Sequence, residues 1–154
     1  RIMEIMAANR RRCYVIDDAT YLMQLDNFAR AKEVGYQKFT DMAVSFQQLL
    51  QRASWTSEDT NVFLLMHPDT DDMGREKPKT IGKMLDEKLT VEGCFDIVLM
   101  TEHNQDGWWF RTHSGGADPV KTPMDMFTDD LIPNDLNVVD MSIRSYYGLE
   151  AAKK

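Results

Sequence analysis

The chain has 154 residues, of which 43% are hydrophobic and 28% are charged, a size and composition typical of one globular domain with its own core. The formal net charge of -7 and the sequence pI near 4.9 exclude a protein that coats nucleic acid through bulk electrostatics, because neutralising phosphates needs a positive surface. No apolar stretch approaches the ~20 residues that span a bilayer, and the first residues form no signal peptide, so we expect a soluble cytoplasmic protein without a membrane partner.

The first residues are predicted to be helical, because Ile2, Ile5 and Met6 follow helical spacing. The chain also begins with arginine, inside this helix. Both features favour the interpretation that further residues precede it.

The two cysteines lie far apart, and each is inside an apolar run. Neither Cys13 nor Cys94 has a spacing typical of metal ligands nearby. We therefore expect both to be reduced core residues of an intracellular protein.

Three consecutive elements predict a parallel βαβ unit. Residues 13–16 and 62–66 are unbroken apolar runs, which are typical of strands buried on both faces. Between them, from Tyr36 to Ala53, apolar residues recur every three or four positions and predict an amphipathic helix. Strand, helix and strand in this order pair in parallel through a right-handed crossover, so the expected fold class is α/β.

The second half predicts a loop, a hairpin and a closing helix. Residues 68–83 are charged and nearly free of apolar side chains, so we expect an exposed, mobile loop, and loops of this length usually have a function. The runs 94–101 and 107–113 flank a turn with an Asp-Gly ending and predict an antiparallel hairpin. Asn134 or Asp135 is expected to cap a final helix, which Gly148 ends.

Polar side chains follow both strands of the predicted βαβ unit. Four hydrophobic residues followed by Asp17 describe a Walker B element, whose acid faces a Mg²⁺ bound to nucleotide phosphates. The neighbouring Asp18 could orient a water, and His67 could hydrogen-bond a terminal phosphate or the attacking water. Buried strands that end in aspartate are common, however, and a histidine at a strand end can also simply bond a backbone carbonyl.

Four segments occur in a distinctive order: VIDDATYLM at 15–23, GYQKFTDMA at 35–43, KPKTIGK at 77–83 and IPNDL at 132–136. Together they resemble a family of RecA-like P-loop ATPases encoded by bacteriophages of Gram-positive hosts. The similarity covers nearly the whole chain, and these motifs in this order are much more specific than a Walker B strand alone.

The resemblance implies a RecA-like P-loop NTPase core, with a mainly parallel sheet, an antiparallel hairpin and flanking helices. Residues 1–154 would form one domain, the C-terminal two-thirds of a nucleotide-binding domain. The resemblance further implies a viral protein of DNA replication, recombination or single-strand annealing that binds ATP and Mg²⁺. By the same match Asp17 holds Mg²⁺ through water, and Asp18 and His67 are the candidate catalytic residues, with His67 sensing the terminal phosphate.

Basic residues are the candidate contacts with single-stranded DNA or with a neighbouring subunit. In RecA-like proteins the loop after the sensing residue often contacts DNA, whereas here nearby acids also allow a merely solvated loop. The candidate loop contacts are Arg75, Lys77, Lys79 and Lys83. In an expected homo-oligomer, Arg111 and Lys121 could reach a neighbour's nucleotide, although ordinary surface cations look the same in sequence.

Two further segments of the second half have more than one interpretation. Residues 114–116 (SGG) could form an anion-binding nest or a flexible turn. Residues 108–110 (WWF) could stack on bases, but side chains alternate along a strand, so at least one must face the core.

The glycine-rich Walker A loop of the family, G-x-x-x-x-G-K-[ST], is absent, because neither Gly74 nor Gly82 is followed by Lys-Ser or Lys-Thr. ATP binding and any ATPase activity therefore depend on a loop supplied upstream, on another chain or on a remodelled fold. One hypothesis is a phage ATP-binding protein of DNA metabolism. A second is a non-catalytic derivative that binds a host protein or nucleoprotein complex, in the manner of an inhibitor of a defence nuclease, since an acidic surface can mimic DNA. A third is a structural subunit of a filament or ring.

Overall fold

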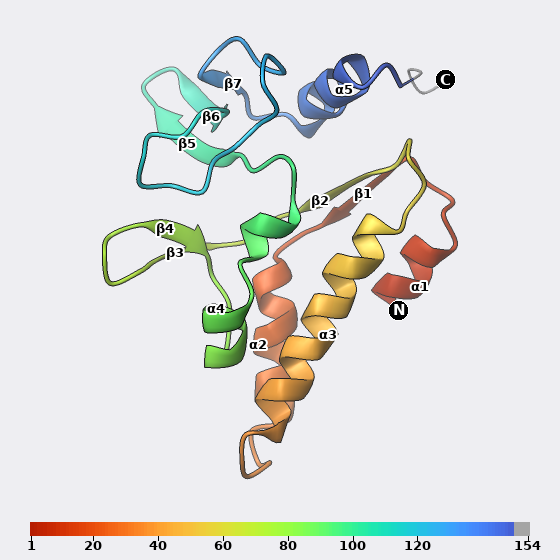
Figure 1. Cartoon of the computed structure of the whole chain (residues 1–154), viewed down its shortest axis with the longest axis vertical. Coiled ribbons are helices and arrows are strands. Elements are labelled where there is room, and N and C mark those ends of the chain that lie inside the picture. The colour runs from red at the N-terminus through yellow and green to blue at the C-terminus, as the bar shows by residue number, and fades with distance from the viewer. Residues whose placement is uncertain (150–154) are drawn as a thin grey trace. The chain divides into compact units, whose positions relative to one another are not determined.

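The computed structural model describes residues 1–149, which divide into two compact units (Figure 1). The first unit comprises Arg1–Asp69 and Pro78–Val91. The second comprises Thr70–Lys77 and residues 92–149. Each unit buries apolar side chains of its own and therefore has its own core.

Two parallel strands, β1 (Cys13–Ile16) and β2 (Asn61–Leu64), belong to the first unit. They pair residue for residue along their whole length. Two helices connect them, α2 (Ala19–Ala29) and α3 (Gln37–Ser54). The two predicted strands, their parallel pairing and the long helix are thus confirmed, whereas α2 is a helix that the sequence pattern did not predict.

Helix α3 buries one continuous apolar face. Neither glycine nor proline interrupts its 18 residues, so its backbone hydrogen bonds can run without a break. The buried side chains of α3 are Met42, Ala43, Phe46, Leu49 and Leu50. Neither α3 nor any other helix within residues 1–149 is long and apolar enough to cross a membrane.

Two short helices contact α3 and complete the core of the first unit. Helix α1 (Ile2–Ala7) confirms the predicted N-terminal helix and buries Met6, which is 1% exposed. Helix α4 (Lys83–Lys88) buries Leu85, which is 2% exposed. A single apolar side chain therefore anchors each of these six-residue helices.

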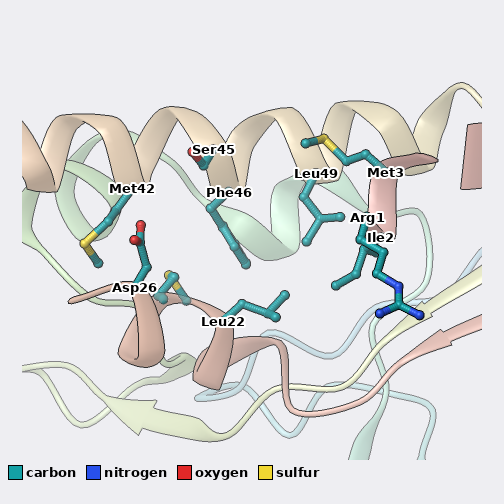
Figure 2. Close-up of a pocket in the computed structure, with 10 residues that line it drawn as sticks. Arg1, Ile2, Met3, Leu22, Asp26, Met42, Ser45, Phe46 and Leu49 are labelled. Atoms are coloured by element: carbon teal, nitrogen blue, oxygen red, sulfur yellow. The ribbon is translucent and has the colours of Figure 1, made fainter. Parts of the chain in front are cut away.

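An open pocket of about 330 Å³ lies between α1, α2 and α3 (Figure 2). Its walls are mainly apolar and include Leu22, Phe46 and Leu49. Figure 2 shows Asp26 and Arg1 at opposite ends of this pocket. The three helices therefore leave space beside the core that the sequence pattern did not indicate.

Three antiparallel strands form the sheet of the second unit. Strand β5 (Met100–Asn104) pairs with β6 (Gly107–Arg111), and β6 pairs with β7 (Leu131–Pro133). The predicted hairpin is confirmed, but β5 continues three residues past its expected end at 101. It does so because the side-chain oxygen of Asn104 accepts the N–H groups of the turn residue Asp106 and of the Trp109 indole, each at 2.9 Å.

The closing helix, α5 (Leu136–Tyr146), is also confirmed. Of the two candidate caps, Asp135 serves, because its carboxylate accepts the N–H of Asn137 at 2.8 Å. Gly148 follows with a φ of +65°, a left-handed conformation that glycine adopts readily at a helix end.

Within residues 68–83, the stretch 68–78 forms a hairpin rather than the expected loop, and Lys83 begins α4. Strand β3 (Pro68–Thr70) pairs with β4 (Glu76–Pro78), and a 3₁₀ helix (Val91–Cys94) follows α4. The turn of this hairpin is organised by a carboxylate, because Asp71 accepts the N–H groups of Met73 and Arg75, each at 2.9 Å. Polar bonds therefore order a segment that lacks the apolar pattern of a strand.

The RecA-like fold is not what the structure contains. Residues 1–149 form a small mixed α/β fold with one two-stranded parallel sheet and two antiparallel sheets, without the extended parallel sheet of a RecA-like core. The strands of the parallel pair are not buried on both faces, since Val15 in β1 is 49% exposed and β2 is only partly buried. The apolar run at 94–99 adds no further strand, because only Val98 makes an isolated bridge, to Lys121. Continuous apolar character was therefore a misleading guide to a large sheet.

The cysteines also differ from expectation. Both Cys13 and Cys94 are exposed, and neither forms a disulfide. The prediction that they are core residues is wrong, because the apolar runs that contain them are covered on one side at most.

Candidate functional site

Backbone hydrogen bonds continue the pairing of β1 and β2 past the ends of both strands. The N–H of Leu65 donates to the carbonyl of Ile16 at 3.0 Å, and the carbonyl of Leu65 accepts the N–H of Ala19 at 2.9 Å. The segments that follow the two strands are therefore held side by side. As a result, Asp18 and His67 come together at the carboxyl ends of two parallel strands, where ligands of parallel sheets commonly bind.

Asp18 and His67 are in direct contact. His67 Nε2 lies 3.1 Å from Asp18 Oδ1, and the two side chains are 51% and 53% exposed. The ring of Tyr21 meets the imidazole edge-on, with 5.7 Å between the ring centroids. The structure thus brings together the two residues that the sequence singled out as the candidate catalytic pair, within reach of solvent.

The backbone of Asp18 adopts a left-handed conformation, with φ +49° and ψ +49°. This conformation costs roughly 1–2 kcal/mol in most residues, although aspartate tolerates it better than larger side chains. Asp18 is also the N-cap residue of α2, yet its carboxylate makes no capping bond. The carboxylate faces His67 instead. Asp18 therefore combines a strained backbone with a side chain that does not cap its helix, a combination typical of functional positions.

Asp17 does not join this pair in a metal site. Across residues 1–149, no three His, Cys, Asp or Glu side chains are grouped closely enough to hold a metal ion. Mg²⁺ is usually bound by one or two carboxylates while phosphate oxygens and waters fill its other positions. Asp17 is exposed, and within residues 1–149 it belongs to no group of side chains that could hold a metal ion by itself.

Thr20 is a site residue that the sequence did not reveal. Its side chain is fully buried, and Oγ1 accepts the N–H of His67 at 3.4 Å and donates to the carbonyl of Lys79 at 3.3 Å. The N–H of Lys79 donates in turn to the carbonyl of His67 at 2.8 Å. A threonine at a helix start is common, so no spacing rule would have picked it out.

The four basic residues proposed for DNA contact fall into both units. Arg75 and Lys77 belong to the second unit, whereas Lys79 and Lys83 belong to the first. Arg75 is engaged locally, since its guanidinium lies 2.8 Å from the carboxylate of Asp71. Hydrogen bonds from the backbone and the side chain of Arg75 hold the pKa of Asp71 below its usual range. Arg75 thus has a structural role in the hairpin turn.

Arg111 is likewise occupied within the second unit. Its guanidinium lies 3.0 Å from Glu102 and 2.9 Å from Asp118. These two ion pairs give Arg111 a structural explanation that needs no neighbouring subunit. Lys121, the other candidate for a contact between subunits, pairs through its backbone with Val98.

In the glycine segment at 114–116, the N–H of Gly115 donates to the carboxylate of Asp118, whereas the N–H of Gly116 donates to the hydroxyl of Ser114. Asp118, with a side chain 3% exposed, accepts the N–H of Gly115 at 2.8 Å and that of Val120 at 3.0 Å. Burial alone would raise the pKa of Asp118, but these hydrogen bonds and the charge of Arg111 outweigh it and hold the pKa below its usual range. Asp118 therefore ties the glycine segment to Val120 and Arg111.

The aromatic run of β6 is divided between core and surface. Phe110 is 8% exposed, which confirms that at least one of the three rings faces the core. Trp109 donates its indole N–H to Asn104. Trp108 is 63% exposed and packs at a tilt of 51° against His103, directly opposite on β5, with 4.5 Å between the ring centroids. Such a cross-strand pair stabilises a hairpin by itself and needs no base to explain it.

The contact between Asp18 and His67 is the feature from which a function is argued below. Comparison with known proteins does not assign the chain to a family. No family model matches the chain, and no curated protein or solved structure matches it either.

Proposed function

We propose that the Asp18–His67 pair forms the phosphate-facing part of a Mg²⁺–nucleotide site, and that the protein binds ATP when a phosphate-holding loop is supplied from outside residues 1–149. The carrying observation is the 3.1 Å contact between the two side chains at the carboxyl ends of β1 and β2. The strained backbone of Asp18 supports the proposal, because strain of this kind gathers at functional sites. The sequence resemblance to phage ATPases of DNA metabolism points the same way and suggests the host cytoplasm as the site of action.

The pair suits chemistry at a terminal phosphate. When His67 is neutral, a bond from Nε2–H to Asp18 leaves the Nδ1 lone pair to accept a proton from water. When His67 is protonated, Nδ1–H can donate to a phosphate oxygen. In both states Asp18 orients the imidazole ring, as a carboxylate partner of histidine commonly does. Mg²⁺, held by Asp17 through water, would neutralise phosphate charge.

The proposal predicts that Asp18→Asn and His67→Gln each weaken binding of Mg-ATP to the full-length protein by about tenfold, or about 1.4 kcal/mol. Asparagine tolerates the left-handed conformation of residue 18, so folding should be preserved. Isothermal titration calorimetry measures the affinities. Because the two side chains act together, the double variant should lower the affinity for Mg-ATP by no more than about twentyfold. Two independent sites would lower it by about a hundredfold.

A matched control is Glu58→Gln, which removes one exposed carboxylate in the same unit. Its affinity for Mg-ATP should equal that of the wild type. A wild-type protein that binds no Mg-ATP up to millimolar concentration would end the proposal, and so would variants at residues 18 and 67 that bind as tightly as the control.

A second candidate function is binding of another protein chain without nucleotide chemistry. Helix α2 favours it, because Tyr21, Leu25 and Phe28 lie at i, i+4 and i+7 and are 46%, 65% and 73% exposed. The same helix also buries Ala19 and Met23. A helix with apolar side chains on two sides is suited to being covered on both, and the occupant that we test is a second copy of this chain.

For this candidate, we predict that Leu25→Glu combined with Phe28→Glu turns a self-associating protein into a monomer, because charges would have to be buried at the interface. Sedimentation velocity measures the change. Since both side chains are exposed, the stability of the monomer should change by less than about 1 kcal/mol. The control is Met141→Glu, an equally exposed position on α5. A wild-type protein that is monomeric at every concentration excludes this assembly.

A further inference from the structure

The backbone of His67 is held at both of its polar groups. The hydroxyl of Thr20 accepts its N–H, and the N–H of Lys79 donates to its carbonyl. Because the same hydroxyl donates to the carbonyl of Lys79, the three residues close a ring of hydrogen bonds. His67 therefore cannot shift along β2 without disturbing Lys79.

The burial of Thr20 makes this ring difficult to replace. Thr20 has an exposed fraction of 0%, so no solvent water can take over the two hydrogen bonds of its hydroxyl. A hydroxyl can accept one hydrogen bond while donating another, which is what joining an N–H to a carbonyl requires. Serine could preserve the ring, whereas valine, with the same shape, could not.

The segment after Lys79 leads directly into a buried element. Gly82, with a φ of +92°, precedes α4 and lies beside Phe39, where an added Cβ would be in ordinary contact with that ring at 3.4 Å. Three residues later, Leu85 anchors α4 in the core with 2% exposure. A displacement of Lys79 would therefore reach α4 through a short, partly buried connection.

We propose that Thr20 is a positioning residue that couples His67 to the segment from Lys79 to α4. Contact of the imidazole with a phosphate then changes the local stability of residues 79–88. The identity of the ligand rests on the proposed function, whereas the coupling itself exists in the ligand-free protein. Occupancy of the Asp18–His67 site is thereby reported to a helix that makes no contact with the ligand.

The ligand-free test is amide hydrogen exchange, measured by NMR on the full-length protein. Thr20→Val should make the amide of His67 exchange about tenfold faster, because its N–H loses the hydroxyl that accepts it. The amide of Lys79 keeps the His67 carbonyl as its acceptor and should respond less. Thr20→Ser should stay within about twofold of the wild type, a rescue that a purely space-filling role would not give. Thr20→Ala, which also lacks the hydroxyl, is the second variant should valine prevent folding.

The coupling is then tested by perturbing His67 in two backgrounds. His67→Gln should alter exchange across residues 79–88 in the wild-type and Thr20→Ser proteins. With valine or alanine at position 20 the response should be several-fold smaller, because only the bond from the Lys79 N–H to the His67 carbonyl still links the two segments. Mg-ATP should have the same background dependence. If the wild type binds no Mg-ATP while the His67→Gln response still depends on the hydroxyl, the proposed function fails and the coupling stands. If the response is the same in all backgrounds, or absent from the wild type, the coupling is overturned.

Discussion

Replacing Asp118 with asparagine is expected to destabilise the second unit by about 3 kcal/mol at pH 7. The carboxylate accepts N–H groups from Gly115, Val120 and the Arg111 guanidinium, at 2.8 to 3.0 Å. A carboxamide has one acceptor oxygen and one donor NH₂ group, so at least one of these three donors would face another donor. Arg111 would also lose the better buried of its two acidic partners.

The pH dependence of this effect has a definite sign. The folded-state pKa of Asp118 is depressed, so its contribution to stability is complete above the unfolded-state value, roughly 3.9, and is lost as the pH falls through the folded-state pKa. The free energy of unfolding of the wild type should therefore exceed that of Asp118→Asn by a constant amount, about 3 kcal/mol, from pH 5 to pH 7. This difference should shrink below about pH 4.

Urea unfolding followed by the fluorescence of Trp108 and Trp109 measures the difference, since both tryptophans lie on β6 of the same unit. Asp129→Asn is the matched control, because that side chain is exposed in the same unit. If the control and Asp118→Asn unfold at the same urea concentration, the hydrogen bonds to the Asp118 carboxylate contribute nothing to stability. The structural explanation for Arg111 is then wrong.

Replacing Phe46 with alanine is expected to destabilise the first unit by about 3 kcal/mol, toward the lower end of the range for buried aromatic residues. Phe46 is 3% exposed and lies in the middle of the buried face of α3. It also lines the open pocket between α1, α2 and α3 (Figure 2), so the space left by the ring would open to that pocket instead of remaining an empty, enclosed cavity. The penalty for a cavity should accordingly be reduced.

Val44→Ala, on the exposed side of the same helix, is the control and should change stability by less than about 0.5 kcal/mol. The unfolding of both variants can be followed by circular dichroism, with Trp55 at the end of α3 as a local fluorescent probe. A loss of about 5 kcal/mol in Phe46→Ala would mean that the pocket is closed in solution.

The elements that the sequence predicted correctly carry strong local signals. Helix α3 combines an unbroken apolar face with an absence of glycine and proline, and α5 has a clear cap in Asp135. The strands β1 and β2 are short apolar runs, and their parallel pairing follows from the long helical connection between them. Local periodicity was therefore enough for these elements and for placing Asp18 and His67 after the ends of β1 and β2, whereas the contact between the two side chains is seen only in the structure.

The features that the sequence missed have no clear apolar pattern. The β3–β4 hairpin is organised by the carboxylate of Asp71, and no apolar alternation announces it. Helix α2 was missed because its exposed side chains are as apolar as its buried ones, which blurs the helical pattern. The extent of the sheet was overestimated because an apolar run such as 94–99 does not specify a strand partner.

The same reasoning explains which site residues escaped detection. Thr20 acquires its role only when Lys79, 59 positions away, returns to it, and no spacing rule spans that separation. The acidic partners of Arg75 and Arg111 likewise become visible only in the folded chain, and the contacts of these cations with DNA or with a neighbouring subunit stay predictions.

The left-handed backbone of Asp18 has a consequence for anyone who redesigns this chain for thermal stability. Glycine adopts that conformation without strain, and a procedure that rewards stability alone would favour it at position 18. The exchange would remove the carboxylate from His67 while improving the melting temperature. At residue 18, a substitution that raises stability would therefore also remove the Asp18–His67 contact. A stability screen would not detect that loss.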